Sequence, residues 1–136
     1  MGARRLKVPK AAHGVAWFDF GQLCEQPLGT ADYLALTERY HTIILSGVPV
    51  LTPDLRNEAR RLMTLVDALY ERRVKLIASA AAPPDALYAA GDGAFEFRRT
   101  ASRLAEMQTR AYIESAKARG RPDSGFAAFA LTTDLI

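Results

Sequence analysis

The chain has 136 residues, which suits one domain or one piece of a larger one. Apolar residues make up 49% of it, but no apolar run reaches the 18 residues of a membrane span, and the basic N-terminus lacks the apolar stretch of a secretory signal. The net charge of +3 comes from bases interleaved with acids, so no single-sign block indicates nucleic-acid binding, and the lone Cys24 favours a cytoplasmic or other reducing compartment.

The first part of the chain predicts a pair of strands. Arg4–Val8 and Val15–Phe20 (VAWFDF) both have strand-like composition, and KAAHG between them is interpreted as a connector. Alternation along the second strand places Trp17 on one face and Phe18 and Phe20 on the other. We expect these aromatic residues to be core; the alternative is that they stack on nucleic-acid bases.

A helix is predicted after Pro27 and Gly29 interrupt the chain. Thr30 is a suitable N-cap for residues 31–41, ADYLALTERYH. Apolar residues then recur at helical spacing: Tyr33, Leu34, Leu36 and Tyr40.

A longer amphipathic helix is predicted over residues 53–73. Thr52 is its expected N-cap, and Pro53 fits the first helical position, where a missing N–H costs nothing. Its apolar residues recur at spacings of three and four: Leu55, Ala59, Leu62, Val66 and Leu69.

Short apolar runs flank this helix, namely Thr42–Leu45 (TIIL) and Val74–Ala80 (VKLIASA). Such β-branched runs are typical of strands buried on both faces. A strand, a helix and a strand in succession predict a right-handed parallel βαβ unit. The predicted fold class is therefore α/β: a parallel βαβ unit with flanking helices and an N-terminal strand pair.

The last third predicts helices separated by loops. A short helix (DALYAA) is predicted with Pro84 near its start, followed by a loop at residues 91–93 (GDG) and a short extended segment, Phe95–Phe97 (FEF). Residues 98–118 are predicted to form a final helix. Its predicted inner side includes Ala101, Leu104, Met107 and Ala111.

Gly120 is a natural stop for that helix, with Pro122 beyond it. The remaining residues show no consistent period. The sequence therefore divides into a domain over residues 1–119 and a loose or partly docked tail over residues 120–136.

Four segments in this order together resemble the C-terminal part of the ZapE family of AAA-type P-loop ATPases, which has mitochondrial relatives. They are GVAWFDFGQLCEQPLGTADYLAL (14–36), YHTIILSGVPVL (40–51), NEARRLMTLVDALYERRVKLIASAAAPPDALY (57–88) and FEFRRTASRLAEMQ (95–108). The resemblance implies a P-loop ATPase-like sheet, binding of ATP and Mg²⁺, and a role in cell division through the division-ring protein.

The sequence departs from the family pattern at the nucleotide site. A P-loop needs a glycine-rich turn followed by lysine and Ser/Thr, and no lysine here follows glycine or precedes Ser or Thr. The acidic pair of a Walker B strand is also missing, since TIIL ends in Ser46 and Gly47. We therefore expect the nucleotide-binding half of the domain to lie upstream of residue 1, and this chain alone to have no ATPase activity.

Two arginines are the candidate nucleotide contacts. Arg99 and Arg103 lie four residues apart, on or just before the last predicted helix, where a fixed cation could reach a γ-phosphate. The alternative is that they are solvated or pair with Glu96 and Glu106. Ser46 and Ser79 end the two buried strands and could orient a water or phosphate, or could be satisfied by local backbone.

Arginines of the long helix, Arg56, Arg60 and Arg61, are expected on a solvated face, with a partner contact as the alternative.

The remaining chemistry-bearing residues predict no metal site, because His13, His41 and Cys24 lack metal-ligand spacing. We expect His41 at the surface or as a cap, and Cys24 as a buried small hydrophobe.

Three functions remain open at this point. The leading interpretation is a segment of a ZapE-like ATPase that needs its missing half. A stand-alone, non-catalytic interaction module is the alternative, and a nucleic-acid-binding domain is the third, weaker interpretation.

Overall fold

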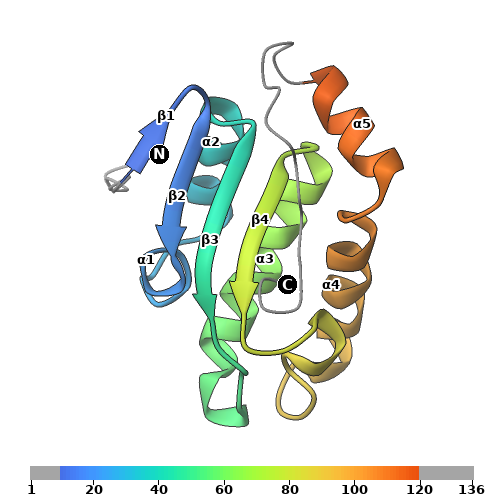
Figure 1. The fold of residues 1–136 in the computed structure, drawn as a ribbon. Coiled ribbons are helices and arrows are strands. Elements are labelled where there is room, and N and C mark those ends of the chain that lie inside the picture. The colour runs from blue at the N-terminus through green and yellow to red at the C-terminus, as the bar shows by residue number, and fades with distance from the viewer. Residues whose placement is uncertain (1–9, 120–136) are drawn as a thin grey trace.

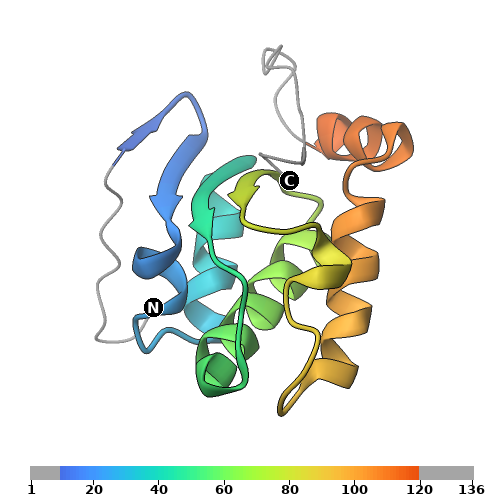
Figure 2. The same cartoon turned by 60° about the horizontal axis from the view of Figure 1, so that its bottom comes forward.

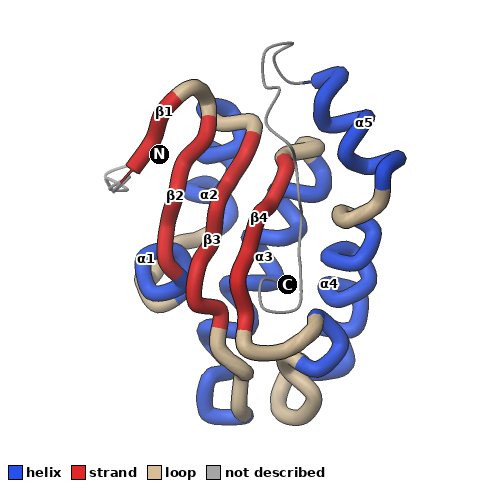
Figure 3. The backbone as a smooth tube through the Cα atoms, in the orientation of Figure 1, coloured by secondary structure: helices blue, strands red, loops and turns tan. Residues whose placement is uncertain are grey.

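A four-stranded sheet is the centre of the computed structural model, which describes residues 10–119. The strands are β1 (Lys10–Ala12), β2 (Val15–Asp19), β3 (Thr42–Val48) and β4 (Lys75–Ala80), in the spatial order β1-β2-β3-β4 (Figures 1 and 3). β2, β3 and β4 are parallel, and β1 is antiparallel to β2. The predicted α/β class, βαβ unit and N-terminal strand pair are therefore confirmed.

The N-terminal pair differs from the prediction in which residues form it. β1 lies in the segment interpreted as a connector, and Lys10 pairs with Trp17. His13 and Gly14 form the turn, both with positive φ (54° and 80°), as tight hairpins require. The predicted strand Arg4–Val8 lies outside the described residues.

Two helices follow β2. α1 (Phe20–Cys24) forms where the sequence predicted only a break, because Asp19 and Gln22 make a reciprocal capping box. α2 (Thr30–Arg39) confirms the predicted helix, but Gly29 rather than Thr30 is its N-cap. The Asp32 carboxylate accepts a hydrogen bond from the Gly29 N–H at 2.9 Å and so replaces a side-chain cap.

The long helix begins later than predicted. Pro53–Leu55 form a 3-10 turn, η1, and the α-helix proper, α3, runs over Arg56–Glu71. The Thr52 hydroxyl donates to the Asp54 carboxylate instead of capping the backbone. Four residues of the predicted stripe are in the core, namely Ala59, Leu62, Val66 and Leu69, whereas Leu55 is only partly buried. Leu65, which the prediction did not name, is buried beside them.

Both crossover helices lie on one face of the sheet (Figures 1 and 2). From β2 to β3 to β4, each strand is added on the same side of the one before it. Because both β–α–β connections are expected to be right-handed, their helices, α2 and α3, lie on the same face of the sheet. Inward-pointing strand residues pack against them: Ala16, Phe18, Ile43, Leu45, Leu76 and Ala78.

The other side of the sheet carries Val15, Trp17, Ile44, Ser46 and Ile77, by alternation along the strands. Among the described residues, no helix lies across it (Figures 1 and 2), and we call it the open face. Trp17 is 43% exposed there, so the prediction that it is a core residue is wrong, whereas Phe18 and Phe20 are buried.

The C-terminal elements stand beside β4. η2 (Pro84–Ala86) is shorter than the helix predicted there, and α4 (Ala94–Glu106) includes the FEF segment that was predicted to be extended. Gly93, with φ of 88°, immediately precedes α4. Because i and i+2 lie on different faces of a helix, Phe97 is buried while Phe95 is 75% exposed.

The single final helix predicted over residues 98–118 is in fact two. α4 ends at Glu106, and α5 (Arg110–Arg119) begins after a turn in which the Thr109 hydroxyl accepts the Tyr112 N–H. The break changes the helical phase, so Tyr112 is buried and Ala111 is exposed, contrary to the predicted inner side. Within residues 10–119, no helix has the length and apolar character needed to cross a bilayer.

Candidate functional site

The carboxyl ends of the parallel strands are the first place to look for a ligand site in an open α/β sheet. Ser79 Oγ accepts a hydrogen bond from the Gly47 N–H at 2.8 Å, across an irregularity in the β3–β4 ladder. Ser46 Oγ lies 3.5 Å from the Phe18 carbonyl oxygen and 3.4 Å from Trp17 Nε1. Both hydroxyls therefore bond neighbouring strands, which matches the local-backbone alternative.

The two predicted nucleotide-contacting arginines both reach α3. Arg103 Nη1 lies 2.5 Å from Asp67 Oδ1, and its Nη2 lies 3.8 Å from Glu71 Oε2. Arg99 Nη2 lies 3.4 Å from Asp67 Oδ2. The acids that pair with them are thus on another helix, and the alternative pairing with Glu96 and Glu106 is wrong.

Aromatic rings complete this contact. The Arg103 guanidinium lies 4.7 Å from the Tyr70 ring centroid, and Arg73 lies 5.1 Å from Tyr70 and 5.4 Å from Tyr112. The two tyrosine rings stack with centroids 6.0 Å apart. The Tyr70 hydroxyl donates to Glu106 at 2.7 Å, and this hydrogen bond raises the pKa of Tyr70. We call Tyr70, Arg73, Arg103 and Tyr112 the arginine–tyrosine cluster.

The cluster lies at the amino ends of the strands. α3 runs from the carboxyl end of β3 back to the start of β4, so Asp67 and Glu71 in its final turns are far from the carboxyl edge. The Tyr112 hydroxyl confirms this position, since it lies 2.7 Å from the carbonyl oxygen of Val74, immediately before β4. The arginine contacts therefore lie at the opposite end of the sheet from Ser46 and Ser79.

The sequence held a signal for Asp67 that the prediction missed. Asp67 and Glu71 are four residues apart on α3, as Arg99 and Arg103 are on α4, so each pair presents two like charges on one helix face. Opposite pairs of this kind favour contact between the two helices.

We expect Arg103→Ala to lower the free energy of unfolding by about 1–2 kcal/mol, because it removes a half-buried ion pair and a cation–π contact together. Arg99→Ala should change it by less than about 0.5 kcal/mol, since that side chain is 68% exposed. Urea unfolding of both variants, of Asp67→Ala and of the Asp67→Ala/Arg103→Ala double variant measures the coupling. Additive effects of the Asp67 and Arg103 substitutions would contradict a direct contact.

The α3 arginines divide into two groups. Arg56 is exposed, and Arg60 forms an exposed pair with Asp92 at 3.4 Å, as expected for a solvated face. Arg61 differs, because its Nη1 donates to the Cys24 carbonyl at 3.0 Å and joins α3 to the end of α1. The expectation of a solvated Arg61 is therefore wrong.

His41 is buried, so its predicted place at the surface or as a cap is also wrong. Its Nδ1 lies 2.8 Å from Thr42 Oγ1 and its Nε2 lies 3.1 Å from the His13 carbonyl oxygen. The ring packs under Gly14, where an added Cβ would come within 2.6 Å of it. His41 therefore holds the β1–β2 hairpin against the start of β3.

Cys24 is buried as predicted, and this burial raises the pKa of its thiol. In the part of the chain that the structure describes, no three residues of the His, Cys, Asp and Glu types gather closely enough to hold a metal ion. Cys24 is thus an unreactive thiol within the core.

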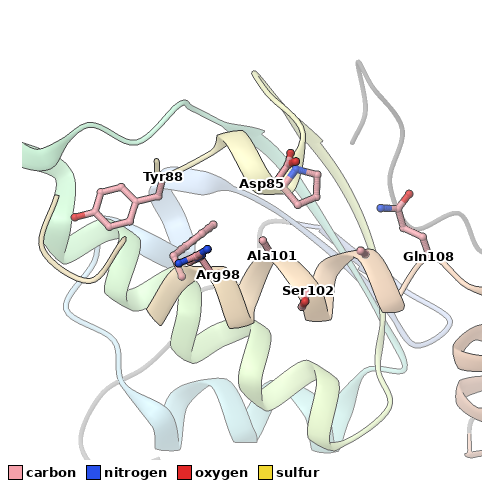
Figure 4. Close-up of a pocket in the computed structure, with 9 residues that line it drawn as sticks. Asp85, Tyr88, Arg98, Ala101, Ser102 and Gln108 are labelled. Carbon is pink, nitrogen blue, oxygen red and sulfur yellow. The ribbon is translucent and has the colours of Figure 1, made fainter. Parts of the chain in front are cut away.

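A cavity of about 530 Å³ lies between η2 and α4. Tyr88 and Phe97 contribute its apolar lining, and their rings meet edge to face. Figure 4 shows Asp85, Arg98 and Gln108 spread along the cavity rather than directed at one point. The polar groups therefore do not define a specific ligand.

The described residues form part of an open α/β sheet in which each strand is added on the same side of the one before it. In that class of protein, ligands bind at the carboxyl edge where the strand order reverses and helices pass to the other face. Among the described strands the order does not reverse, and both crossover helices remain on one face.

Comparison with known proteins identifies the family. Residues 1–116 match the model of the AFG1-like ATPase family, and the chain belongs to that family. This confirms the family resemblance inferred from the sequence.

Three relatives illustrate the match. The chain is 44% identical to the cell division protein ZapE of Escherichia coli K12, over 70% of this chain and 25% of that protein. It is 36% identical to an uncharacterized Schizosaccharomyces pombe protein, over 82% of this chain and 31% of that protein. It is 32% identical to lactation elevated protein 1 homolog B of Danio rerio, over 80% of this chain and 28% of that protein. The matches thus span about a quarter to a third of each relative. No solved structure matches the chain.

Proposed function

We propose that this chain is the C-terminal part of an AFG1-like ATPase that hydrolyses ATP with Mg²⁺ only when joined to the rest of the protein. The observation that carries the proposal is the family match over residues 1–116. Two further observations support it. The sequence has no lysine in a P-loop context, and the described strands advance without the reversal at which a nucleotide crevice would form.

In this proposal the chain extends and stabilises the sheet, and the missing half supplies the phosphate-binding loop and magnesium carboxylates. Arg99 and Arg103 contact α3 near the amino ends of the strands, opposite the carboxyl edge where ligands of such sheets bind, so the proposal favours a structural role for them over nucleotide sensing. Of the two, Arg99 has the more available side chain, at 68% exposed against 21% for Arg103. The contacts of Arg103 with Asp67 and Tyr70 favour a positioning role for it.

We expect no ATP turnover above background when the purified 136-residue chain is assayed with Mg²⁺, because it has no amide cradle, phosphate lysine or metal carboxylate pair. The measurement is steady-state phosphate release, with full-length Escherichia coli ZapE assayed alongside as the control. We expect that control to hydrolyse ATP and to lose activity when Mg²⁺ is chelated. Magnesium-dependent turnover by the chain alone, abolished by Arg99→Ala, would overturn the proposal.

The printed name of the Escherichia coli relative links that protein to cell division. We propose the same link for the intact protein that contains this chain, through contact with the division-ring protein in the cytoplasm. The free, buried Cys24 suits a reducing compartment. Cosedimentation of the intact protein with polymerised division-ring protein tests the contact; no pelleting above the protein-only control would reject it.

A further inference from the structure

The exposed side of α4 carries a stripe of residues with an aromatic ring at its start. Phe95, Arg98, Ser102 and Ala105 recur at spacings of three and four and are all exposed, so they share the helix face opposite the core. Phe95 is 75% exposed, and the Arg98 guanidinium lies 5.5 Å from the centroid of its ring. Aromatic and arginine side chains are enriched at protein–protein interfaces. We call these four residues the α4 stripe.

The cavity of about 530 Å³ between η2 and α4 lies along this stripe. Three of the four stripe residues line it, namely Arg98, Ser102 and Ala105, and Pro84 and Tyr88 add apolar surface. Sites for small molecules place a few polar groups around one point, whereas the polar groups here are spread along the cavity (Figure 4). The cavity is therefore an apolar groove that suits a protein segment.

Two charges at the groove have no partner of opposite sign. Within residues 10–119, neither Asp85 nor Arg98 forms an ion pair. Asp85 lies opposite Ala101 along the groove, and Arg98 is about one helical turn nearer the start of α4 (Figure 4). An occupant that brings a base to Asp85 and an acid to Arg98 would pair both charges.

A second copy of the α4 stripe has side chains of the right sizes for the groove. Phe95 and Ala105 lie equally far from Thr100 along α4, and so do Arg98 and Ser102. Two α4 helices that lie antiparallel and cross at the level of Thr100 therefore place Phe95 of each copy opposite Ala105 of the other. They likewise place Arg98 opposite Ser102. Each large side chain then faces a small one, which allows close packing.

The same arrangement pairs the charges. Arg98 of one copy faces Ser102 of the second copy, beside the wall of the groove that carries Asp85. Because a two-fold contact repeats every interaction, Arg98 of the second copy reaches Asp85 of the first in the same way. Both the sizes and the charges that the groove requires are thus present in the stripe and the groove of a second copy.

We propose that this surface is a two-fold contact at which two copies of the chain pair through antiparallel α4 helices. The contact follows α4 over its 13 residues, a length of about 20 Å. This is at the small end of specific interfaces, so we expect a reversible dimer with a Kd on the order of 100 µM. The contact does not depend on ATP hydrolysis, because the groove, the stripe and both charges belong to the described residues.

Sedimentation equilibrium of the 136-residue chain from about 1 µM to about 500 µM tests the contact. We expect monomers at the lowest concentration and mostly dimers at the highest. Phe95→Ser should raise the Kd at least about 10-fold. Asp85→Arg and Arg98→Asp should each do the same, because each brings two like charges together. The double variant Asp85→Arg/Arg98→Asp should return the Kd to within about 3-fold of the original, since it restores opposite charges.

Arg56→Asp is the matched control, because Arg56 is an exposed arginine of α3 away from the groove, and it should leave the Kd unchanged. Circular dichroism and urea unfolding establish that each variant is folded. A chain that remains monomeric at the highest concentration would overturn the proposal. A dimer that is insensitive to Phe95→Ser would also overturn it, because the contact would then lie on another surface, such as the open face. Failure of the double variant to restore the Kd would overturn the antiparallel pairing.

The rest of the intact protein is the competing occupant of the groove, and cross-linking at Ser102 distinguishes it from a second copy. Ser102→Cys is introduced into the 136-residue chain and into the intact protein, with the unsubstituted forms as background; Ser102 is exposed and Cys24 is buried. A short bifunctional maleimide should link two copies through position 102 in both proteins. A cysteine that cross-links in the chain alone, but is protected from the reagent in the intact protein, would place another part of that protein in the groove and overturn the proposal.

Discussion

Leu62→Ala is expected to lower the free energy of unfolding by about 2–4 kcal/mol. Leu62 is 2% exposed and lies on the face of α3 that packs against the sheet. Removing its side chain leaves a cavity that the surrounding strands and helices cannot fill, since β3 and β4 are fixed by their ladder. Val66→Ala at the next turn should cost somewhat less, because fewer buried methyl groups are removed.

Urea unfolding followed by circular dichroism measures these changes, with the midpoint and the slope fitted separately. Arg56→Ala on the exposed side of α3 is the matched control and should stay within about 0.5 kcal/mol of the unsubstituted chain. Equal effects at Leu62 and Arg56 would mean that α3 does not pack in the orientation described.

The β3–α3–β4 unit could be predicted from the sequence because each of its parts carries a local signal. The TIIL and VKLIASA runs are short and β-branched, the intervening residues repeat at three and four, and a connection of this kind is nearly always right-handed. Family membership could be predicted for a related reason, since it depends on the order of several segments rather than on one residue.

Helix boundaries were less predictable, because different groups compete to satisfy the same backbone N–H. Thr30 and Thr52 both have the composition of an N-cap. In the fold, the Asp32 carboxylate accepts a hydrogen bond from the Gly29 N–H, and the Thr52 hydroxyl donates to the Asp54 carboxylate instead of capping the helix. The hydroxyl is only one of several nearby acceptors, and the sequence does not rank them.

Partners across the tertiary structure were the least predictable. Arg103 pairs with Asp67, which is 36 residues away, whereas the acids near it in sequence were the predicted partners. His41 likewise packs against a distant turn, and its Nε2 lies 3.1 Å from the carbonyl oxygen of His13, 28 residues earlier. Such contacts depend on how the helices and strands pack against one another. The sequence therefore shows which residues carry a charge or a ring, but not which residue each of them will contact.

The FEF segment illustrates the same limit and supplies the second large expected effect. Aromatic residues at i and i+2 suit a strand, and in a strand Phe95 and Phe97 would share one face. In α4 the two rings point in different directions instead. Phe97 is 2% exposed and packs edge to face on Tyr88 at 5.8 Å, whereas Phe95 is 75% exposed.

Phe97→Ala is therefore expected to lower the free energy of unfolding by about 3–5 kcal/mol, the range for a buried phenylalanine. Phe95→Ala should change the free energy of unfolding by less than about 0.5 kcal/mol, because the Phe95 ring is exposed and is not packed in the core. The pair differs only in position, so urea unfolding of the two variants compares identical chemical changes. Similar losses from both substitutions would indicate that the segment is extended with both rings on one face, and would show the helical assignment of α4 at these residues to be wrong.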